Sequence, residues 1–361
     1  MRGRDREWRA VLDLLRAVED GRAGALLVDG EPGVGKTRLL AEAAEHARAR
    51  GFAVAAGAAE ELGELAPLAP LAAALGVRAG GDEAETTLVE RLRAELDGRA
   101  AAGPVLVVLD DLHFADPGTL RAVRTLHARL RDRRVAWLLA RSPQYGGAAG
   151  RLFGVLERAG ARRLGLAPLP AEAIAEVAAD ETGAPPGRDL LDLIEGAGGN
   201  PRLVVDLLAG LRDEDALDFT GGDAHPRSDR PPARLHGFAR ERLTRLGREA
   251  RHLLVLAAVL GRAFTPEEVG ELLGATPAAL LPALEEAFAA GLLAADGDAI
   301  GFRHELVRQA ILAALPGAVR HALHRQIGEY LIDSGGPPAE AAEHLTLGVR
   351  HGDRHALACL D

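Results

Sequence analysis

The sequence predicts an α/β fold in which a parallel sheet carries helices on both faces and is followed by smaller helical domains. Three observations support this prediction. Short apolar strands alternate with helical patterns up to residue 166, a glycine-rich loop joins the first strand to a helix, and the strand patterns stop between residues 170 and 212. Such alternation forces neighbouring strands to run parallel, because each connection crosses over the sheet through a helix.

A glycine-rich loop follows the first predicted strand, Ala25–Asp29. Its sequence, GEPGVGKT over residues 30–37, fits the phosphate-binding pattern G-x-x-x-x-G-K-[ST], which is expected by chance about 5 times in 10,000 chains of this composition. Glycines can take positive φ, so backbone N–H groups turn towards a phosphate, and the helix predicted over Thr37–Arg50 adds its positive end. A glycine-rich hairpin is the alternative. The pattern predicts a P-loop NTPase fold whose nucleotide contacts are Gly30, Gly33, Val34, Gly35, Lys36, Thr37 and Arg38.

Lys36 is the only lysine among the 43 basic residues of the chain. Its ammonium is a compact, mobile charge that suits β and γ phosphates, and the planar guanidinium of arginine replaces it poorly. We therefore expect Lys36 to act in catalysis as well as in binding. The hydroxyl of Thr37 is expected to bind Mg²⁺.

Four more strands are predicted after the loop. They cover Phe52–Gly57, Pro104–Asp110, Val135–Ala140 and Arg162–Leu166, and the helical patterns between them cover Thr86–Leu96, Pro117–Leu130 and Ala148–Arg158. Repeated strand and helix units of this kind are typical of a sheet that is buried on both faces.

Two adjacent carboxylates end the apolar strand Pro104–Asp110. In P-loop enzymes such a strand lies near the phosphate loop and holds Mg²⁺ through its first acid, which predicts this role for Asp110. Asp111 would then orient or deprotonate the attacking water as a general base. The alternative is that both acids cap the following turn.

Arg141 follows the strand Val135–Ala140, at the carboxyl end where ligands bind in open α/β sheets. A fixed cation at this place can sense or stabilise a γ-phosphate and so take part in catalysis. Because arginine is abundant in this chain, a surface arginine remains the alternative.

The second half of the chain no longer shows the alternation of strands and helices. Residues 170–212 predict short helices, and residues 213–232, with paired glycines and prolines among charges, predict a linker or a mobile loop. The next part predicts three helices and a hairpin around an Asp-Gly turn within residues 291–303. Three helices and a hairpin make a winged helix. The predicted helices cover Arg242–Leu260, Pro266–Leu273 and Pro277–Ala290.

The C-terminal residues 320–361 predict an antiparallel helix pair that stops without a capping signal, which leaves open that the chain is a fragment of a longer protein. The single cysteine, Cys359, allows no internal disulfide and favours a reducing, cytoplasmic setting. The N-terminus is charged rather than apolar, and the longest apolar run, Leu65–Val77, is broken by two prolines, so no membrane span is expected. A net charge of −10 argues against a broad nucleic-acid-binding surface.

Four motifs together resemble those of signal-transduction ATPases with numerous domains, and in particular of the large ATP-binding LuxR-type bacterial regulators. They are Gly3–Glu7 before the phosphate loop, LVVLDDLHFAD over Leu106–Asp116, Gly198–Pro201, and Phe302–Leu306. The resemblance spans about residues 2–310. Phe114 stands where many relatives carry tryptophan.

This resemblance implies further nucleotide contacts. Gly3 and Arg4 are expected near the adenine, and Pro201 is expected to pack against the base. Arg141 is implied to be the first sensor, and His304 to touch the β-phosphate of bound ADP and lock a closed state. The alternatives are that Pro201 starts a helix with Asn200 as its N-cap, and that His304 is a partly buried histidine of a small domain.

The function that follows is an ATP-binding, Mg²⁺-dependent and slowly hydrolysing switch, closed with ADP and open with ATP. Expected partners are ATP, other copies of the chain in the ATP state, and an unknown inducer or protein, while DNA is reached only through a C-terminal domain absent from this chain. The alternative is an AAA+ ATPase of origin-binding or DNA-remodelling type. Helix 277–290 argues against DNA because it has no Lys or Arg and carries Glu285 and Glu286. A metabolic P-loop kinase is less consistent with the long C-terminal half.

Five regions are expected. They are a P-loop nucleotide-binding domain (1–168), a helical lid (169–212), a linker (213–236), a winged-helix domain (237–316) and the start of a helical, TPR-like region (317–361).

Overall fold

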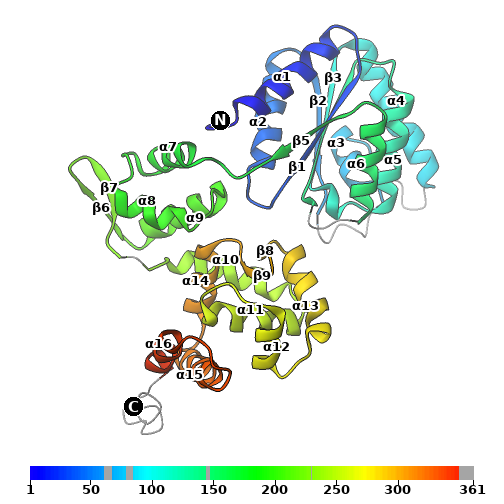
Figure 1. The fold of residues 1–361 in the computed structure, drawn as a ribbon. Coiled ribbons are helices and arrows are strands. Elements are labelled where there is room, and N and C mark those ends of the chain that lie inside the picture. Colours follow the sequence, from blue (N-terminus) through cyan, green and yellow to red (C-terminus); the bar gives the residue numbers. More distant parts are fainter. Residues whose placement is uncertain (61–66, 79–83, 144–146, 229, 349–361) are drawn as a thin grey trace. The chain divides into compact units, whose positions relative to one another are not determined.

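The computed structural model describes residues 1–60, 67–78, 84–143, 147–228 and 230–348. The chain divides into two compact units, residues 1–173 and 174–361, which are described separately here as the nucleotide unit and the C-terminal unit (Figure 1). The C-terminal part of the predicted helix pair, with Cys359, lies outside the described residues.

The nucleotide unit is built on a five-stranded parallel sheet with the strand order β2-β3-β4-β1-β5. All five strands were predicted from the sequence to within one residue at each end. Their bounds are β1 Gly24–Gly30, β2 Ala53–Ala58, β3 Val105–Asp110, β4 Val135–Arg141 and β5 Arg162–Leu166.

Helices cover both faces of this sheet, as the sequence predicts (Figure 1). One face packs against α1 (Asp5–Glu19) and α2 (Lys36–Ala49), and the other packs against the remaining helices. These are α3 Ala69–Leu75, α4 Glu85–Ala102, α5 Pro117–Arg129 and α6 Gly147–Arg158. The α4 helix extends beyond the predicted helix Thr86–Leu96, mainly at its C-terminal end.

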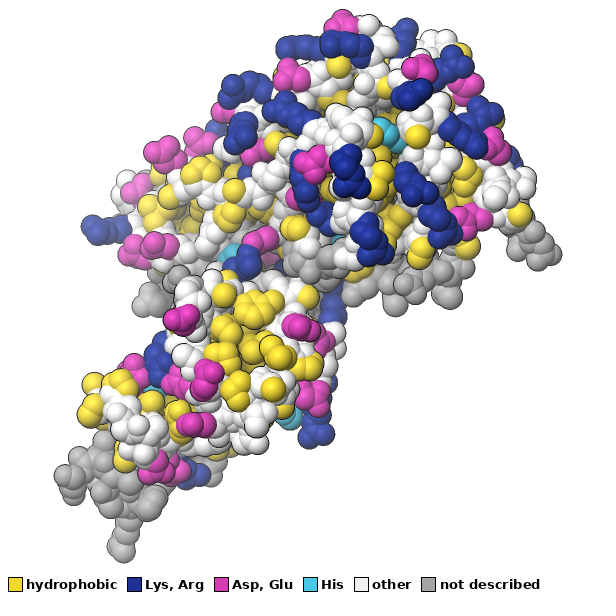
Figure 2. Space-filling view, turned by 45° about the vertical axis from the view of Figure 1, so that its right-hand side comes forward, with side chains coloured by type: hydrophobic (Ala, Val, Ile, Leu, Met, Phe, Trp, Pro, Cys, Tyr) yellow, Lys and Arg dark blue, Asp and Glu magenta, His cyan; other side chains and the backbone are white. Residues whose placement is uncertain are grey.

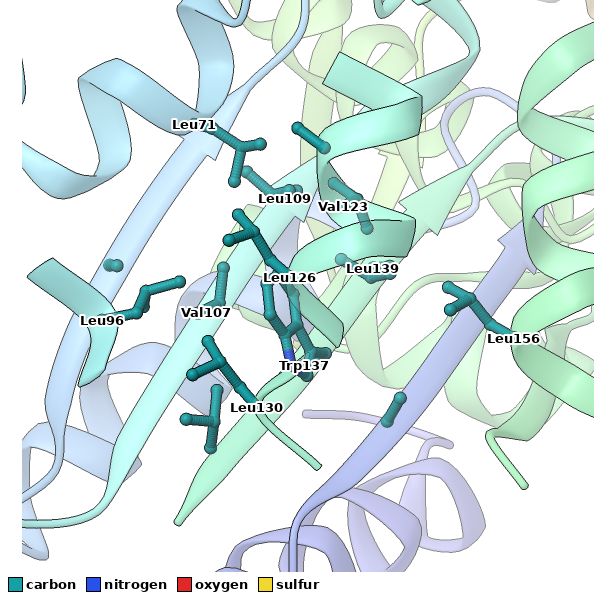
Figure 3. Packing of buried hydrophobic residues seen from close by; sticks show 14 of the residues in the cluster. Leu71, Leu96, Val107, Leu109, Val123, Leu126, Leu130, Trp137, Leu139 and Leu156 are labelled. Atoms are coloured by element: carbon teal, nitrogen blue, oxygen red, sulfur yellow. The ribbon is translucent and has the colours of Figure 1, made fainter. Parts of the chain in front are cut away.

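Each strand supplies both cores, because successive side chains point to opposite faces. Leu27 belongs to the core under α3–α6, while Leu26 and Val28 belong to the core under α1 and α2. Trp137, 1% exposed, lies in the first core close to Val107 and to the α5 side (Figure 3). Apolar side chains thus cover both faces of the sheet. This close packing fixes the positions of the strand ends, which carry polar side chains such as Asp29, Asp110 and Arg141.

The carboxyl ends of β1, β3 and β4 meet at one edge of the sheet. Asp29 pairs in register with Arg141, and Leu109 pairs with Leu139. The loops that leave these strands therefore start side by side.

The C-terminal unit begins in α7 (Ala171–Thr182) and is mostly helical. The elements that follow are α8 Arg188–Glu195, α9 Pro201–Asp213, β6 Leu217–Thr220, β7 Asp223–Pro226, α10 Ala233–Thr244, α11 Arg248–Leu260, α12 Pro266–Leu273, α13 Pro277–Ala289, β8 Leu293–Asp296, β9 Ala299–Phe302, α14 Glu305–Ala314, α15 Gly317–Asp333 and α16 Pro338–Gly348. The short helices, the α12 and α13 helices, the hairpin and the helix pair up to residue 348 agree with the sequence prediction.

Two predictions in this unit were wrong. The segment predicted as a linker or mobile loop contains the antiparallel hairpin β6–β7, because Gly221 and Gly222 both take positive φ (68° and 95°) and close a tight turn. The predicted helix Arg242–Leu260 is two helices that break at Gly247, whose N–H donates to the Glu286 carboxylate (2.7 Å). The Glu286 side chain, 39 residues further along the chain, thus satisfies the N-cap N–H of α11.

The assignment of these elements to a lid, a winged helix and a repeat region stays a prediction. Within the part of the chain that the structure describes, the helices are too short or too polar for any of them to traverse a lipid bilayer.

Candidate nucleotide site

The phosphate loop runs from the end of β1 to the start of α2. Gly33 and Gly35 have φ of 84° and 103°, a region that side chains with a Cβ disfavour. Gly30 is needed for a different reason, since a Cβ there would lie 2.7 Å from Val34 Cγ1. Val34 is itself 2% exposed, so it anchors the loop to the core under α1 and α2.

Lys36 lies inside this loop with its ammonium fully engaged. Nζ donates to the carbonyls of Gly30 (2.9 Å) and Glu31 (3.0 Å) and to Ser142 Oγ (2.8 Å). Burial lowers the pKa of Lys36, and the charges of Asp111, Asp110 and Asp29 oppose this shift. A phosphate oxygen would therefore meet a positioned cation at the centre of the loop.

Thr37 and Asp110 provide two hard oxygen ligands side by side. Thr37 Oγ1 donates to Asp110 Oδ2 at 2.6 Å, and Asp110 Oδ1 accepts from the Asp111 N–H at 2.8 Å. Neighbouring ligands of an octahedral Mg²⁺ at about 2.1 Å from the ion lie about 3 Å apart, so this pair fits the ion after a small separation. Thr37 and Asp110 are the residues that would hold it.

Asp111 follows the strand end in a left-handed conformation with φ of 49°. Burial, together with the neighbouring charge of Asp110, raises the pKa of its carboxyl to about 6, against the opposing effect of Lys36. A carboxylate with a pKa near neutrality is suited to accept a proton from water at physiological pH. Asp111 does not cap the turn with its side chain, since no such hydrogen bond forms at this residue.

Arg4 braces the phosphate loop from the N-terminal segment. Its Nη2 donates to the carbonyl of Val34 (2.9 Å) and to that of Ala167 beyond β5 (2.7 Å), and the side chain is buried. Gly3, at φ 61°, lies against Ala173, where a Cβ would come within 2.5 Å of the alanine Cβ. The predicted contact of both residues with an adenine stays a prediction.

Arg38 and Arg141, two further predicted site residues, make no hydrogen bond to the phosphate loop among the contacts that the structure describes. Arg38 is 75% exposed and its Nε lies 3.1 Å from Glu42 Oε1, one turn further along α2. Arg141 is buried, but its Nε donates to Asp29 Oδ1 at 2.7 Å, and its guanidinium carbon lies 4.9 Å from the Phe153 ring centroid. The alternative of a surface arginine is thereby wrong for Arg141, while its sensor role stays a prediction.

Two residues of this site were missed by sequence reasoning. Ser142, 2% exposed, accepts from Lys36, and its own N–H donates to His113 Nδ1 at 3.3 Å. Burial, with the charges of Lys36 and Arg141, lowers the pKa of His113 to about 4, so its ring is a neutral acceptor at pH 7. The available signals were the position of Ser142 directly after a strand end and of His113 two residues after the paired acids.

His304 and Pro201 belong to the C-terminal unit. Asn200 is the N-cap of α9, its Oδ1 accepting from the N–H of Arg202 (3.1 Å), and Pro201 occupies the first helical turn, as the alternative interpretation predicts. His304 is 5% exposed, and its buried Nδ1 has no hydrogen-bond partner. Burial and then the charges of Arg242 and Arg303 lower the pKa of His304 to about 4, so the ring is neutral.

The loop before α9 lies against His304. A Cβ on Gly198, whose φ is 55°, would come within 2.9 Å of His304 Nδ1. The two motifs that the resemblance treats separately are therefore in contact inside one unit. Their predicted contacts with a nucleotide stay predictions.

Comparison with known proteins supports the interpretation of the nucleotide unit. Residues 1–139 match the family model of the AAA ATPase domain. No curated protein matches this sequence significantly. This part of the chain is therefore similar in sequence to AAA ATPase domains, in agreement with its phosphate loop and parallel sheet.

Solved structures share the fold at low sequence identity. The ORC2 protein of Aeropyrum pernix, solved as ADPNP–ADP complexes, has a TM-score of 0.55 and 15% identity, over 87% of this chain and 95% of that chain. The Walker-type ATPase of Pyrococcus abyssi has a TM-score of 0.55 and 13% identity, over 86% and 96%. A signal-transduction ATPase with a tetratricopeptide repeat sensor from Pyrococcus horikoshii has 16% identity over 99% of this chain and 50% of that chain. Its TM-score of 0.34 is too low to indicate a shared fold.

Proposed function

We propose that this chain is the ATPase module of a LuxR-type signal-transduction switch, which binds ATP, hydrolyses it slowly, and alternates between an ADP-closed and an ATP-open state. The observation that carries the proposal is the cluster at the edge of the sheet. A buried ammonium, a hydroxyl–carboxylate pair and a carboxyl group of raised pKa lie on adjacent loops, at Lys36, Thr37–Asp110 and Asp111.

These groups divide the chemistry of hydrolysis between them. Asp111 takes the proton of a water whose oxygen attacks the γ-phosphorus, and the bond to the β-phosphate oxygen breaks to leave ADP. Lys36 offsets negative charge on the β and γ phosphates. Thr37 and Asp110 would hold a Mg²⁺ ion, which would neutralise part of the negative charge of the phosphates.

The switch requires that ATP and ADP favour different states. In the ADP state, the free Nδ1 of His304 is proposed to bind the β-phosphate, and Pro201 to pack against the base. Only such a difference in contacts can move the equilibrium, and a change from 1:99 to 99:1 needs about 5.5 kcal/mol of differential binding. ATP then permits self-association, under control of an unknown inducer or protein partner.

The second candidate is an AAA+ ATPase that acts on DNA with residues 237–316. Helix α13, the expected reading helix, has no Lys or Arg, and its residue Leu281 is 55% exposed. Hydrophobic and acidic side chains are prominent on the part of Figure 2 that shows the C-terminal unit. Phosphate binding requires cations, so a protein-packing role fits this surface better.

The first test is to purify the chain without added nucleotide, denature it, and identify what it releases by chromatography. Near-stoichiometric ADP from the wild type, and none from Lys36→Ala, is the expected result. Arg22→Ala, at a position 72% exposed, is the matched control for loss of a cation and should still release ADP. An empty wild-type protein with rapid ATP turnover would overturn the ADP-closed state, and stimulation of that turnover by DNA would favour the second candidate.

A further inference from the structure

Asp29 occupies a special place at the end of β1, directly before the phosphate loop. It is 8% exposed, and its two carboxylate oxygens bind two different arginines. Oδ1 accepts from Arg141 Nε at 2.7 Å, and Oδ2 accepts from Arg163 Nε at 2.5 Å. The arginines come from β4 and β5, the two strands that flank β1, so the three residues form a charged row across the sheet.

The resting position of Arg141 is prepared by α6 as well as by Asp29. The guanidinium lies over the ring of Phe153, and a Cβ on Gly150 would come within 2.7 Å of Arg141 Nη1. Gly150 therefore leaves the space that this rotamer needs. Two side chains, Asp29 from β1 and Phe153 from α6, thus contact the guanidinium, and Gly150 of α6 leaves room for it.

The same arginine lies next to the nucleotide machinery. Its neighbour Ser142 accepts a hydrogen bond from Lys36, and β4 runs alongside the strand that leads into the phosphate loop. The charges of Arg141 and Lys36 both act on His113, which shows that the two cations share one electrostatic environment. The oxygens of a γ-phosphate bound next to the loop would thus compete with the Asp29 carboxylate for this guanidinium.

The second arginine makes such an exchange feasible. Releasing the only partner of a buried carboxylate leaves an uncompensated charge, which is strongly unfavourable. Arg163 remains bound to Asp29 when Arg141 leaves, because it uses the other oxygen. Asp29 therefore keeps a counter-ion in both arrangements.

We propose that Asp29 is a latch, a positioning residue that holds Arg141 away from the nucleotide until a γ-phosphate draws it off. The proposal rests on the proposed function, since it requires that the loop binds ATP and ADP. The latch lowers the affinity for ATP and leaves that for ADP unchanged, because only ATP brings the group that competes with Asp29. Arg141 therefore changes its partner only when the bound nucleotide has a γ-phosphate.

Two substitutions should raise the preference for ATP over ADP, and a third should lower it. Asp29→Asn keeps the shape but removes the charge, and it should tighten ATP relative to ADP by about tenfold. Gly150→Ala pushes Arg141 out of its resting place without touching Asp29, and it should act in the same direction. Arg163→Gln leaves Arg141 as the only partner of Asp29, so it should weaken ATP relative to ADP.

The measurement is a titration of the full chain with a fluorescent non-hydrolysable ATP analogue and with the matching ADP derivative. The ratio of the two dissociation constants is the readout, and Arg141→Ala in the Asp29→Asn background should abolish the gain. A purely structural Asp29 would lower stability without changing the ratio, and circular dichroism separates that case. If Asp29→Asn does not fold, the ratio of the two dissociation constants is measured in Gly150→Ala instead.

The outcomes separate the two proposals. A folded wild type that binds neither nucleotide overturns the proposed function and the latch together. A wild type that binds both, with the same ratio in Asp29→Asn and Gly150→Ala, overturns the latch alone. A higher ATP preference in these two variants and a lower one in Arg163→Gln supports it.

Discussion

Asp111 differs from Asp110 although the two carboxylates are neighbours in the chain. Asp110 accepts hydrogen bonds from Thr37 and from the Asp111 N–H. Burial and the adjacent charge instead raise the pKa of Asp111 to about 6. In the proposed function the two acids have different tasks, ion binding for Asp110 and proton transfer for Asp111.

This difference predicts the pH dependence of turnover. Only the deprotonated carboxylate can accept a proton, so ATP turnover should halve near pH 6 and fall about tenfold for each further unit of acidity. Asp111→Asn should lower turnover at pH 8 by at least about a hundredfold while ATP binding persists. Phosphate release measured between pH 5 and 9 checks both expectations.

The matched control is Asp116→Asn, which changes a carboxyl group that caps α5 in the same loop region. It should keep the acid limb of the profile. An unchanged profile in Asp111→Asn would exclude Asp111 as the base.

Only part of the candidate site could be predicted from the sequence. The loop and the paired acids follow a fixed spacing, so Lys36, Thr37 and Asp110 could be placed together before the structure was known. The partner Asp29 of Arg141 could not, because it is 112 residues away in the chain and only the strand order brings the two together. Ser142 and His113 belong to no motif of fixed spacing, and only their positions after a strand end and after the paired acids distinguish them.

At the scale of elements, the β-strands were predictable because each is a short apolar run between breakers. The hairpin β6–β7 was not, since its strands have only four residues each and much of their surface is exposed. At the break between α10 and α11, the Gly247 N–H donates to Glu286, which is 39 residues away in sequence. Long-range hydrogen bonds of this kind leave no local pattern.

The start of α9 gives a prediction about stability. Asn200 Oδ1 accepts from the N–H groups of Arg202 and Leu203, so Asn200→Ala should lower the free energy of unfolding of the C-terminal unit by about 1 kcal/mol. Thr276→Ala, which removes the N-cap of α13 in the same unit, is the matched comparison and should cost a similar amount. Urea denaturation followed by circular dichroism measures both, and a cost of only a few tenths for Asn200→Ala would show that this cap is not formed.

At the scale of the whole molecule, buried neutral histidines occur in both units. Burial is the main cause that lowers the pKa of His113, His304 and His324 to about 4. The unfolded chain takes up these protons near pH 6.5, while the folded chain takes them up only near pH 4. Stability is therefore full above pH 6.5 and falls as the pH drops through this window.

The expected slope is about 1.4 kcal/mol per pH unit for each such histidine. Denaturation at pH 7.5 and at pH 5 tests this, and His324→Gln should flatten the slope for the C-terminal unit. His252→Gln, at an exposed position, is the control. Equal stability at both pH values would mean that these rings are accessible to protons in the folded chain.

The single lysine has a consequence for covalent chemistry. Lys36 carries the only side-chain amine of the sequence, and it lies buried between two backbone carbonyls and a serine hydroxyl. Any acyl group that reaches a lysine of this protein, from a reagent or from an enzyme, therefore removes the charge that the phosphate loop is built around. Acylation on lysine and loss of the bound nucleotide become one event, and an occupied site should resist the acyl donor.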